Sequence, residues 1–119
     1  MTFQDAIADA RSELGDTYEG SHAYADSDMI RYAVDGVREA WRLRPSLRYD
    51  VSTGRLYDAE KVITGDSGQL YIEIPLPDNV QSAISCFIVY SCLLRDVTDE
   101  SNAQAAATAR DRFDQIVMR

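Results

Sequence analysis

The side chains best suited to chemistry are few in this sequence and do not gather into a recognisable catalytic set. The single histidine, His22, lies in a polar stretch without the set of Cys, His or Glu residues that a metal site or a catalytic base requires. Serine nucleophiles therefore lack a plausible histidine partner. The stretch Gly65–Gly68 holds two glycines, but neither the lysine nor the helix of a phosphate-binding loop follows it. We expect no enzymatic activity, no metal and no cofactor.

Two groups of carboxylates were considered as sites. Asp26-Ser27-Asp28 alternates as calcium ligands do, but it lacks the regular spacing and the distal glutamate of an oxygen cage, so helix capping is the better explanation. Asp96, Asp99 and Glu100 form a cluster that is most typical of a solvated turn. A paired general acid and base is the alternative there, and the sequence offers it no pocket or partner.

Both cysteines, Cys86 and Cys92, fall in the apolar run Ala83–Leu94. Six residues apart on a helix, they point to different sides and cannot easily form a disulfide with each other. We expect buried free thiols in a reducing cytoplasm. The apolar run is too short to span a bilayer, and the acidic N-terminal segment does not resemble a signal peptide. No membrane association is expected.

Length and charge limit the classes of function further. A chain of 119 residues is enough for one domain with one modest core. Its 12 basic and 20 acidic residues give a net charge of −8. A negative net charge disfavours binding to nucleic-acid phosphates, because such binding depends on Lys and Arg displacing counterions. It is compatible with a protein that DNA passes without sticking.

Hydrophobic spacing predicts a mainly α fold with helices near residues 3–14, 28–43, 79–96 and 102–118. The expected start and stop signals are Thr2 with Asp5, Gly15, Ser27, Pro45, Asp78 with Gln81, and Ser101. The third helix is apolar almost all round and should be central. Gly36 costs about 1 kcal/mol in a helix. Either another element packs closely against it, which we favour, or the helix is locally irregular. The predicted core is Ile7, Leu14, Ile30, Val34, Val37, Trp41, Ile84, Phe87, Ile88 and Phe113.

Residues 47–74 change to a β pattern. Leu47, Tyr49 and Val51 alternate with polar residues, and a turn at 52–54 precedes Arg55-Leu56-Tyr57. A second turn at 64–68 precedes the alternating run 70–74. Two or three antiparallel strands of this size need support from a helix or from another subunit. The prediction is a single domain, residues 1–119, built as a four-helix bundle with a small β-hairpin between helices 2 and 3.

Aromatic residues are the strongest sign of an interaction surface. Tyr49, Tyr57 and Tyr71 all fall in the β segment, and together they exceed what one sheet face needs. Tyrosine is enriched at protein–protein contacts because it buries area and keeps a hydroxyl for a partner. The alternative is that the tyrosines pack the hairpin onto its own helices. The hypothesised interface residues are Tyr49, Tyr57, Tyr71, Phe113 and Met118.

The order of several short motifs resembles a known family. The motifs are Asp28-Met29-Ile30-Arg31, Asp35-Gly36-Val37-Arg38, Arg44-Pro45, Ile74-Pro75-Leu76-Pro77, Arg95-Asp96, Asn102 and Ala105-Ala106-Ala107. In this order they are similar to the head–tail connector (adaptor) proteins of tailed bacteriophages. The β segment departs from the family pattern in detail.

The resemblance implies a structural virion protein. Such a protein would form a homo-oligomeric ring of about twelve copies between the portal protein and the tail or stopper/nozzle proteins. DNA would pass through the lumen without specific binding. The protein would be assembled in the host cytoplasm and found at the head–tail joint of the virion. The alternative is an acidic DNA mimic that inhibits a nucleic-acid enzyme, but arginines are interleaved with the carboxylates of the second and fourth helices.

Overall fold

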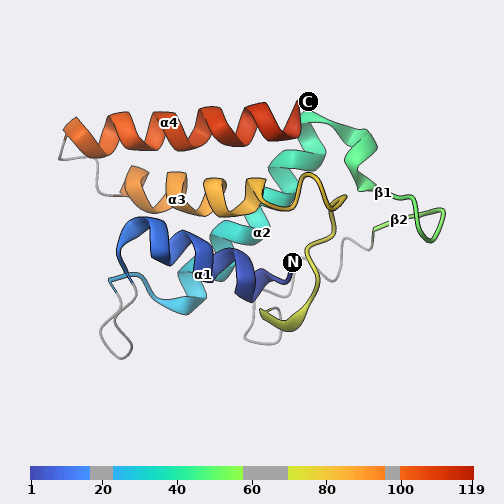
Figure 1. The fold of residues 1–119 in the computed structure, drawn as a ribbon, viewed down its shortest axis with the longest axis horizontal. Helices are drawn as coiled ribbons and strands as arrows, with labels where there is room; N and C mark the ends of the chain where they lie inside the picture. Colours follow the sequence, from blue (N-terminus) through green and yellow to red (C-terminus); the bar gives the residue numbers. More distant parts are fainter. Residues whose placement is uncertain (17–22, 58–69, 96–99) are drawn as a thin grey trace.

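A computed structural model describes residues 1–16, 23–57, 70–95 and 100–119. Within these residues the α-helices are α1 (Phe3–Leu14), α2 (Asp26–Leu43), α3 (Ala83–Arg95) and α4 (Glu100–Val117). A short 3-10 helix, η1 (Pro45–Arg48), leads into the antiparallel strands β1 (Tyr49–Asp50) and β2 (Arg55–Leu56), in which Tyr49 is paired with Leu56. The prediction of a mainly helical bundle with a hairpin between helices 2 and 3 is confirmed (Figure 1).

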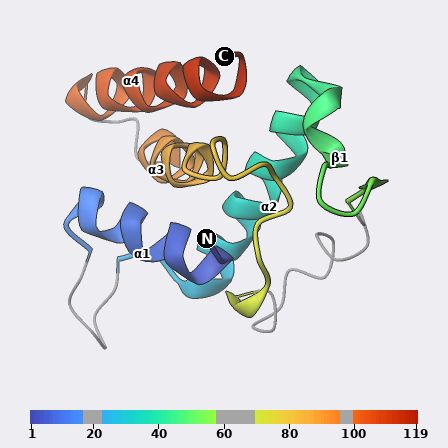
Figure 2. The ribbon, with the colours of Figure 1, turned by 45° about the vertical axis from the view of Figure 1, so that its right-hand side comes forward.

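α3 occupies the centre of the bundle. It contacts each of the other three helices. Figure 2 shows α3 nearly end-on, with α4 above it, α1 below it and α2 to its right. Its buried apolar side chains point to several sides, among them Ile84, Phe87 and Val89. A helix that is apolar almost all round can be buried on several sides. The central position that the sequence predicted for this helix follows from that composition.

The core agrees with most of the predicted residues. Ile7, Ile30, Val34, Val37, Ile84, Phe87, Ile88 and Phe113 are buried. Leu14 and Trp41 are only partly buried and pack against the edge of the core. Phe3 and Met29 belong to the fully buried set, as do Ile74 and Leu76 from the segment before α3. That segment is therefore part of the core rather than a free linker.

Gly36 lies against α3, as its unfavourable helix propensity predicted. A Cβ atom at this position would lie 3.1 Å from the Cβ, Cγ and Cδ1 atoms of Phe87. This separation is shorter than ordinary van der Waals contact, so a side chain here would push α2 and α3 apart. Glycine allows the two helices to approach, and this approach offsets its conformational cost.

The start of α1 is as predicted, but the cap residues of α2 and α4 differ. Asp5 and Thr2 form a reciprocal capping box, and Gly15 ends α1 with a left-handed φ of 73°. α2 begins at Asp26 after Ala25, which provides no side-chain cap, so Ser27 lies inside the helix. Ser101 likewise lies inside the first turn of α4. The predicted cap at Ser101 is therefore wrong, whereas α2 starts near Ser27 as predicted but without a side-chain cap.

The start of α3 also differs. The helix begins at Ala83, and the predicted cap Asp78 is exposed in a run of turns before it. The predicted partner in the capping box, Gln81, is buried instead. Its amide donates to the carbonyl oxygens of Ile74 and Leu76, both at 3.1 Å. Those buried carbonyls need a donor, and this need overrides the local capping pattern.

The β segment is smaller than the alternation of its residues predicted. Leu47 lies in η1, where its side chain is buried, because Pro45 favours the first turn of a helix. The run 70–74 is not a third strand of the hairpin. It pairs with the N-terminus, through a bridge between Thr2 and Glu73 and a bond of 3.1 Å from Phe3 N to Ile72 O. The predicted turn at 64–68 lies outside the described residues.

Candidate interaction surface

The residues considered for chemistry have structural partners where the structure describes them. Asp26 and Asp28, once compared with calcium ligands, accept from the guanidinium groups of Arg11 at 2.6 Å and Arg95 at 3.0 Å. They thus tie α2 to α1 and α3. His22, Gly65–Gly68, Asp96 and Asp99 lie outside the described residues, as does the side chain of Glu100. Among the residues described, no three His, Cys, Asp or Glu side chains are grouped so that they could hold a metal ion.

Both cysteines are free, as predicted, and neither is an activated nucleophile. Burial raises the pKa of Cys92 to about 12, and its Sγ lies 3.4 Å from the sulfur of Met29 in the core. Cys86 is half-buried; burial raises its pKa, and the nearby Glu13 adds to the effect. Because the thiolate is the reactive form, the raised pKa values lower the reactivity of both side chains at neutral pH.

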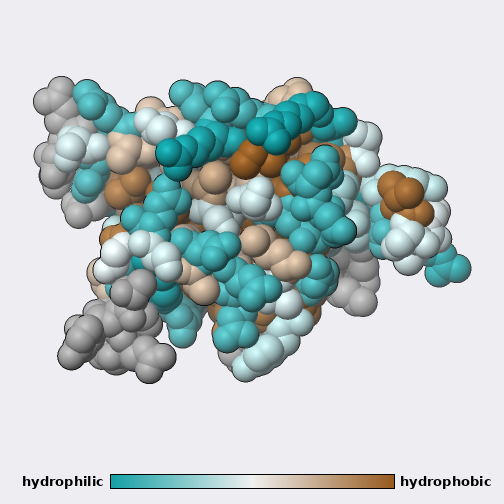
Figure 3. Space-filling view, in the orientation of Figure 1, coloured by the Kyte–Doolittle hydropathy of each residue, from teal (hydrophilic) through white to brown (hydrophobic). Residues whose placement is uncertain are grey.

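The hairpin projects from the helical body and exposes apolar side chains (Figure 1). Val51 is 82% exposed and Leu56 is 62% exposed, and about half of Tyr49 is accessible. These three residues are called the hairpin face below. Figure 3 shows an apolar patch on the lobe that projects to the right of the molecule. Apolar residues exposed on so small an element are typical of a contact with another protein.

The turn of the hairpin explains why Val51 is exposed. The carboxylate of Asp50 accepts from the Ser52 amide at 3.0 Å and from the Ser52 hydroxyl at 2.7 Å. The hydroxyl bond holds the pKa of Asp50 below its usual value. Gly54 closes the turn with a φ of 69° and donates to the Asp50 carbonyl at 2.9 Å. This local network begins the turn at Val51 and places that side chain in solvent.

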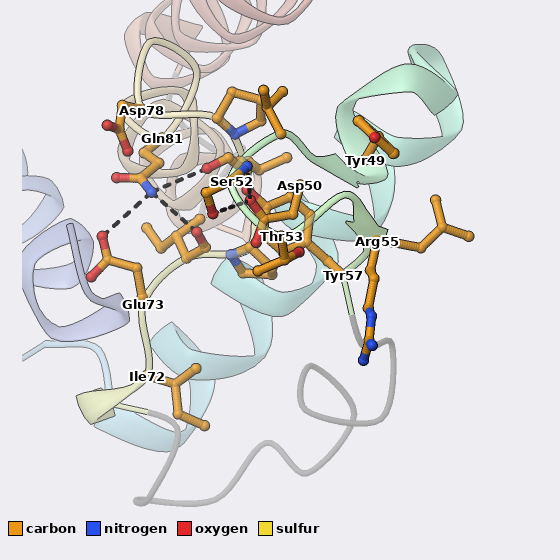
Figure 4. A pocket seen from close by; sticks show the side chains of 16 residues that line it. Tyr49, Asp50, Ser52, Thr53, Arg55, Tyr57, Ile72, Glu73, Asp78 and Gln81 are labelled. Atoms are coloured by element: carbon orange, nitrogen blue, oxygen red, sulfur yellow. Dashed lines mark hydrogen bonds between the residues drawn. The ribbon is translucent and has the colours of Figure 1, made fainter.

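A cleft of about 1110 Å³ lies between the hairpin and the segment Ile72–Asp78 (Figure 4). Gln81 holds the segment Ile72–Asp78 in place through its hydrogen bonds to the carbonyl oxygens of Ile74 and Leu76. The carboxylates of Asp50, Glu73 and Asp78 all line the cleft. Tyr57 is half-buried in it, and burial together with the charge of Asp50 raises its pKa. The arrangement can accept a cationic or hydrogen-bonding segment.

The structure brings together some of the predicted interface residues. Tyr49 and Tyr57 line the cleft, and Tyr71 is exposed outside it, in the segment that pairs with the N-terminus. Met118 is exposed at the C-terminal end of α4, beside Arg44, which donates to the Val117 carbonyl at 3.2 Å.

Phe113 is a correction to the predicted interface. It is 0% exposed, and its ring centroid lies 5.0 Å from that of Phe87. It belongs to the buried stripe of α4, with Ala106, Ala109 and Val117. A residue at that helical spacing packs on α3 and cannot reach a partner on the surface of the folded chain.

Val51 and Leu56 are interface candidates that the sequence analysis did not single out. The alternation of Leu47, Tyr49 and Val51 suggested one continuous strand with a shared face. The available signal was the turn chemistry of Asp50, Ser52 and Gly54, which ends the strand before Val51. A hydrophobic residue at the first position of such a turn lies outside the strand, so its side chain does not pack on either face of the sheet.

Comparison of the chain with known protein families, curated proteins and solved structures finds no match. What the protein does must therefore be inferred from its own residues. Within the described ranges, none of the helices has the length and apolar content needed to cross a bilayer.

Proposed function

We propose that the protein is a structural component of a tailed-phage virion, an adaptor that forms a ring between the portal and the tail. The observation that carries this proposal is a projecting hairpin with an exposed apolar face on a helical body whose core is complete without it. The order of the adaptor-like motifs along the chain supports the same function. Its partners are the portal protein, tail or stopper/nozzle proteins, and further copies of itself in a ring of about twelve.

The same geometry explains why the ring would form on the portal and not in solution. Because the helical core needs no second chain, the free protein is monomeric or weakly associating. The hairpin is small, so a contact made by its face alone buries little area and is weak. A portal ring that holds several copies side by side raises their local concentration and makes weak lateral contacts effective. Assembly therefore takes place on the portal, in the host cytoplasm, before the tail is joined.

The charge of the chain suits a wall past which DNA slides. A net charge of −8 repels phosphates and prevents DNA from sticking in the lumen of the ring. No catalytic role is part of this proposal, and none of the partners is a membrane.

The charge distribution favours an adaptor over a DNA mimic. Mimicry needs a continuous array of carboxylates on one face. Arg110 bonds to Glu39 at 3.0 Å and to Asp114 at 3.2 Å, and Arg112 bonds to Glu13 at 2.9 Å. These arginines interrupt the negative surface of α1, α2 and α4.

Replacing Tyr49, Tyr57 and Tyr71 together with serine should leave the helices folded but reduce ring formation on the portal. The reason is that Tyr49 and Tyr71 are exposed and Tyr57 is only half-buried, so their loss removes contact area rather than core. Circular dichroism would check the fold. Co-sedimentation with the portal protein encoded by the same phage, followed by negative-stain imaging, would check assembly.

The matched control replaces the same three tyrosines with phenylalanine. This variant keeps the buried area and loses only the hydroxyls, so its rings should be close to normal. Full rings of normal stability with the serine variant would show that these tyrosines serve only their own chain.

A further inference from the structure

A second concave surface lies at the other end of the molecule from the hairpin. It is a groove of about 450 Å³ between α1 and α4. Figure 1, with the longest axis horizontal, places the hairpin at the right and the C-terminal end of α1 and the N-terminal half of α4 at the left. The groove is lined by Glu13, Leu14, Val89, Leu93, Ala105, Thr108, Ala109 and Arg112.

The groove exists because, among the described residues, the apolar helix α3 has three helical neighbours and no fourth. α2 covers one side of α3, and no described helix lies over the opposite side, between α1 and α4 (Figure 2). Val89 and Leu93 of α3 therefore line the groove, and Ala105 and Ala109 make its α4 wall shallow. Apolar side chains are visible in this region, at the left of Figure 3. A groove of small and aliphatic side chains suits an apolar insert.

Among the described residues, unpaired charges of opposite sign lie at the two ends of the molecule. On the hairpin, Arg55 is exposed and forms no ion pair with any described residue. On the groove, Glu13 is half-exposed at the rim, where it already pairs with Arg112. Asp9 lies one turn before Glu13 on the same side of α1, is exposed, and has no ion-pair partner in the described part of the chain. A hairpin that enters the groove would bring its arginine toward Asp9 and Glu13 of α1.

We infer that the hairpin face of one copy docks into the α1–α4 groove of the next copy. The inserted residues are Val51 and Leu56, and Arg55 faces Asp9 and Glu13 on α1. Because the two surfaces are different and lie at opposite ends of the chain, the contact is heterologous and each copy can bind two neighbours. The inference deepens the proposed function and rests on it for closure of the series into a ring.

Site-directed crosslinking tests this contact. Val51→Cys and Ala105→Cys are introduced together in a Cys86→Ser chain, leaving Cys92 in place because it is buried. A short bismaleimide is then added at high protein concentration. Docking should give a ladder of covalent dimers, trimers and larger species. We expect about tenfold more product than from random collision, because docked thiols experience millimolar local concentration.

The matched control moves one cysteine by two residues along α4. Ala107 is exposed like Ala105, but it does not line the groove. The pair Val51→Cys with Ala107→Cys should therefore give only the background of random collision. An equal ladder from both pairs, or none from the Ala105 pair, would overturn the docking.

Direction is tested with a mixture of two single variants. Copies that carry only Val51→Cys are mixed with copies that carry only Ala105→Cys. The covalent products should be dimers and nothing larger, because each copy has one introduced cysteine and can be crosslinked to one neighbour. Longer products from the mixture would contradict a head-to-tail contact.

The docking and the proposed function can fail separately. A ring imaged on the portal without a ladder from the Ala105 pair would overturn the hairpin-in-groove contact and leave the adaptor function standing. A ladder from that pair without any ring on the portal would support the docking and count against the adaptor function.

Discussion

Replacing Phe87 with alanine is expected to lower the free energy of unfolding by about 3–5 kcal/mol. The ring is only 8% exposed and packs against Phe113 and Tyr90, with centroids 5.0 Å and 5.6 Å away. It also lies under the guanidinium of Arg110 and against the backbone of Gly36. Truncation would thus leave a cavity where α2, α3 and α4 meet. Urea unfolding followed by circular dichroism would measure the loss.

Leu94→Ala is the matched control for Phe87→Ala. Leu94 lies on the same helix and about half of its surface is exposed. Its truncation should cost less than about 1 kcal/mol, because exposed sites are usually tolerant. An equally small loss for Phe87→Ala would mean that α3 is not the central helix.

Replacing Arg11 with methionine should cost about 3–5 kcal/mol, because it removes a buried guanidinium that pairs with two carboxylates. Arg11 is 7% exposed and Asp16 is 8% exposed. The two arginine nitrogens bond to Asp16 and Asp26, both at 2.6 Å. Methionine keeps the length and most of the apolar contact of the arginine. The loss should therefore report the charge, and urea unfolding would measure it.

Two further variants separate the buried pair from surface effects. Arg31→Met removes an exposed arginine paired with Asp28 at 3.3 Å, and it should cost no more than about 1 kcal/mol. Adding Asp16→Asn to Arg11→Met should recover part of the loss, because the buried carboxylate that lost its guanidinium is then neutral. Equal losses for Arg11→Met and Arg31→Met would show that the Arg11 network contributes little.

The helices and most of the core were predictable because their signals are local. Residues such as Ile30, Val34 and Val37 recur at helical spacing, and this pattern needs no knowledge of a distant partner. Gly36 was informative for a related reason. A residue that weakens its own helix predicted the close approach of another element, and that element is α3 at Phe87.

Partners that the local pattern does not reveal account for the errors at Gln81 and in the run 70–74. Asp78 and Gln81 have the spacing of a capping box, but Gln81 bonds to carbonyls several residues earlier in the chain. The run 70–74 alternates like a strand of the hairpin, yet its partner is the N-terminus. A local pattern cannot distinguish these choices, because the competing donor or strand is brought in by the tertiary fold.

The candidate site was only partly predictable for the same reason. The β segment and Tyr49 were identified from composition, whereas Val51 became a candidate only once the turn of the hairpin was seen. The α1–α4 groove has no local signature. It arises from the way three helices surround α3, and the alanines at 105 and 109 predict close helix contact rather than a hollow.

Imaging the purified protein with its portal is the most direct test of the adaptor function. Native mass spectrometry of the protein alone should give chiefly monomer. Electron microscopy of the mixture should then show a closed ring of this chain seated on the portal, with an open lumen along the portal axis. A portal that stays bare at high protein concentration, with the chain still monomeric, would contradict the proposal.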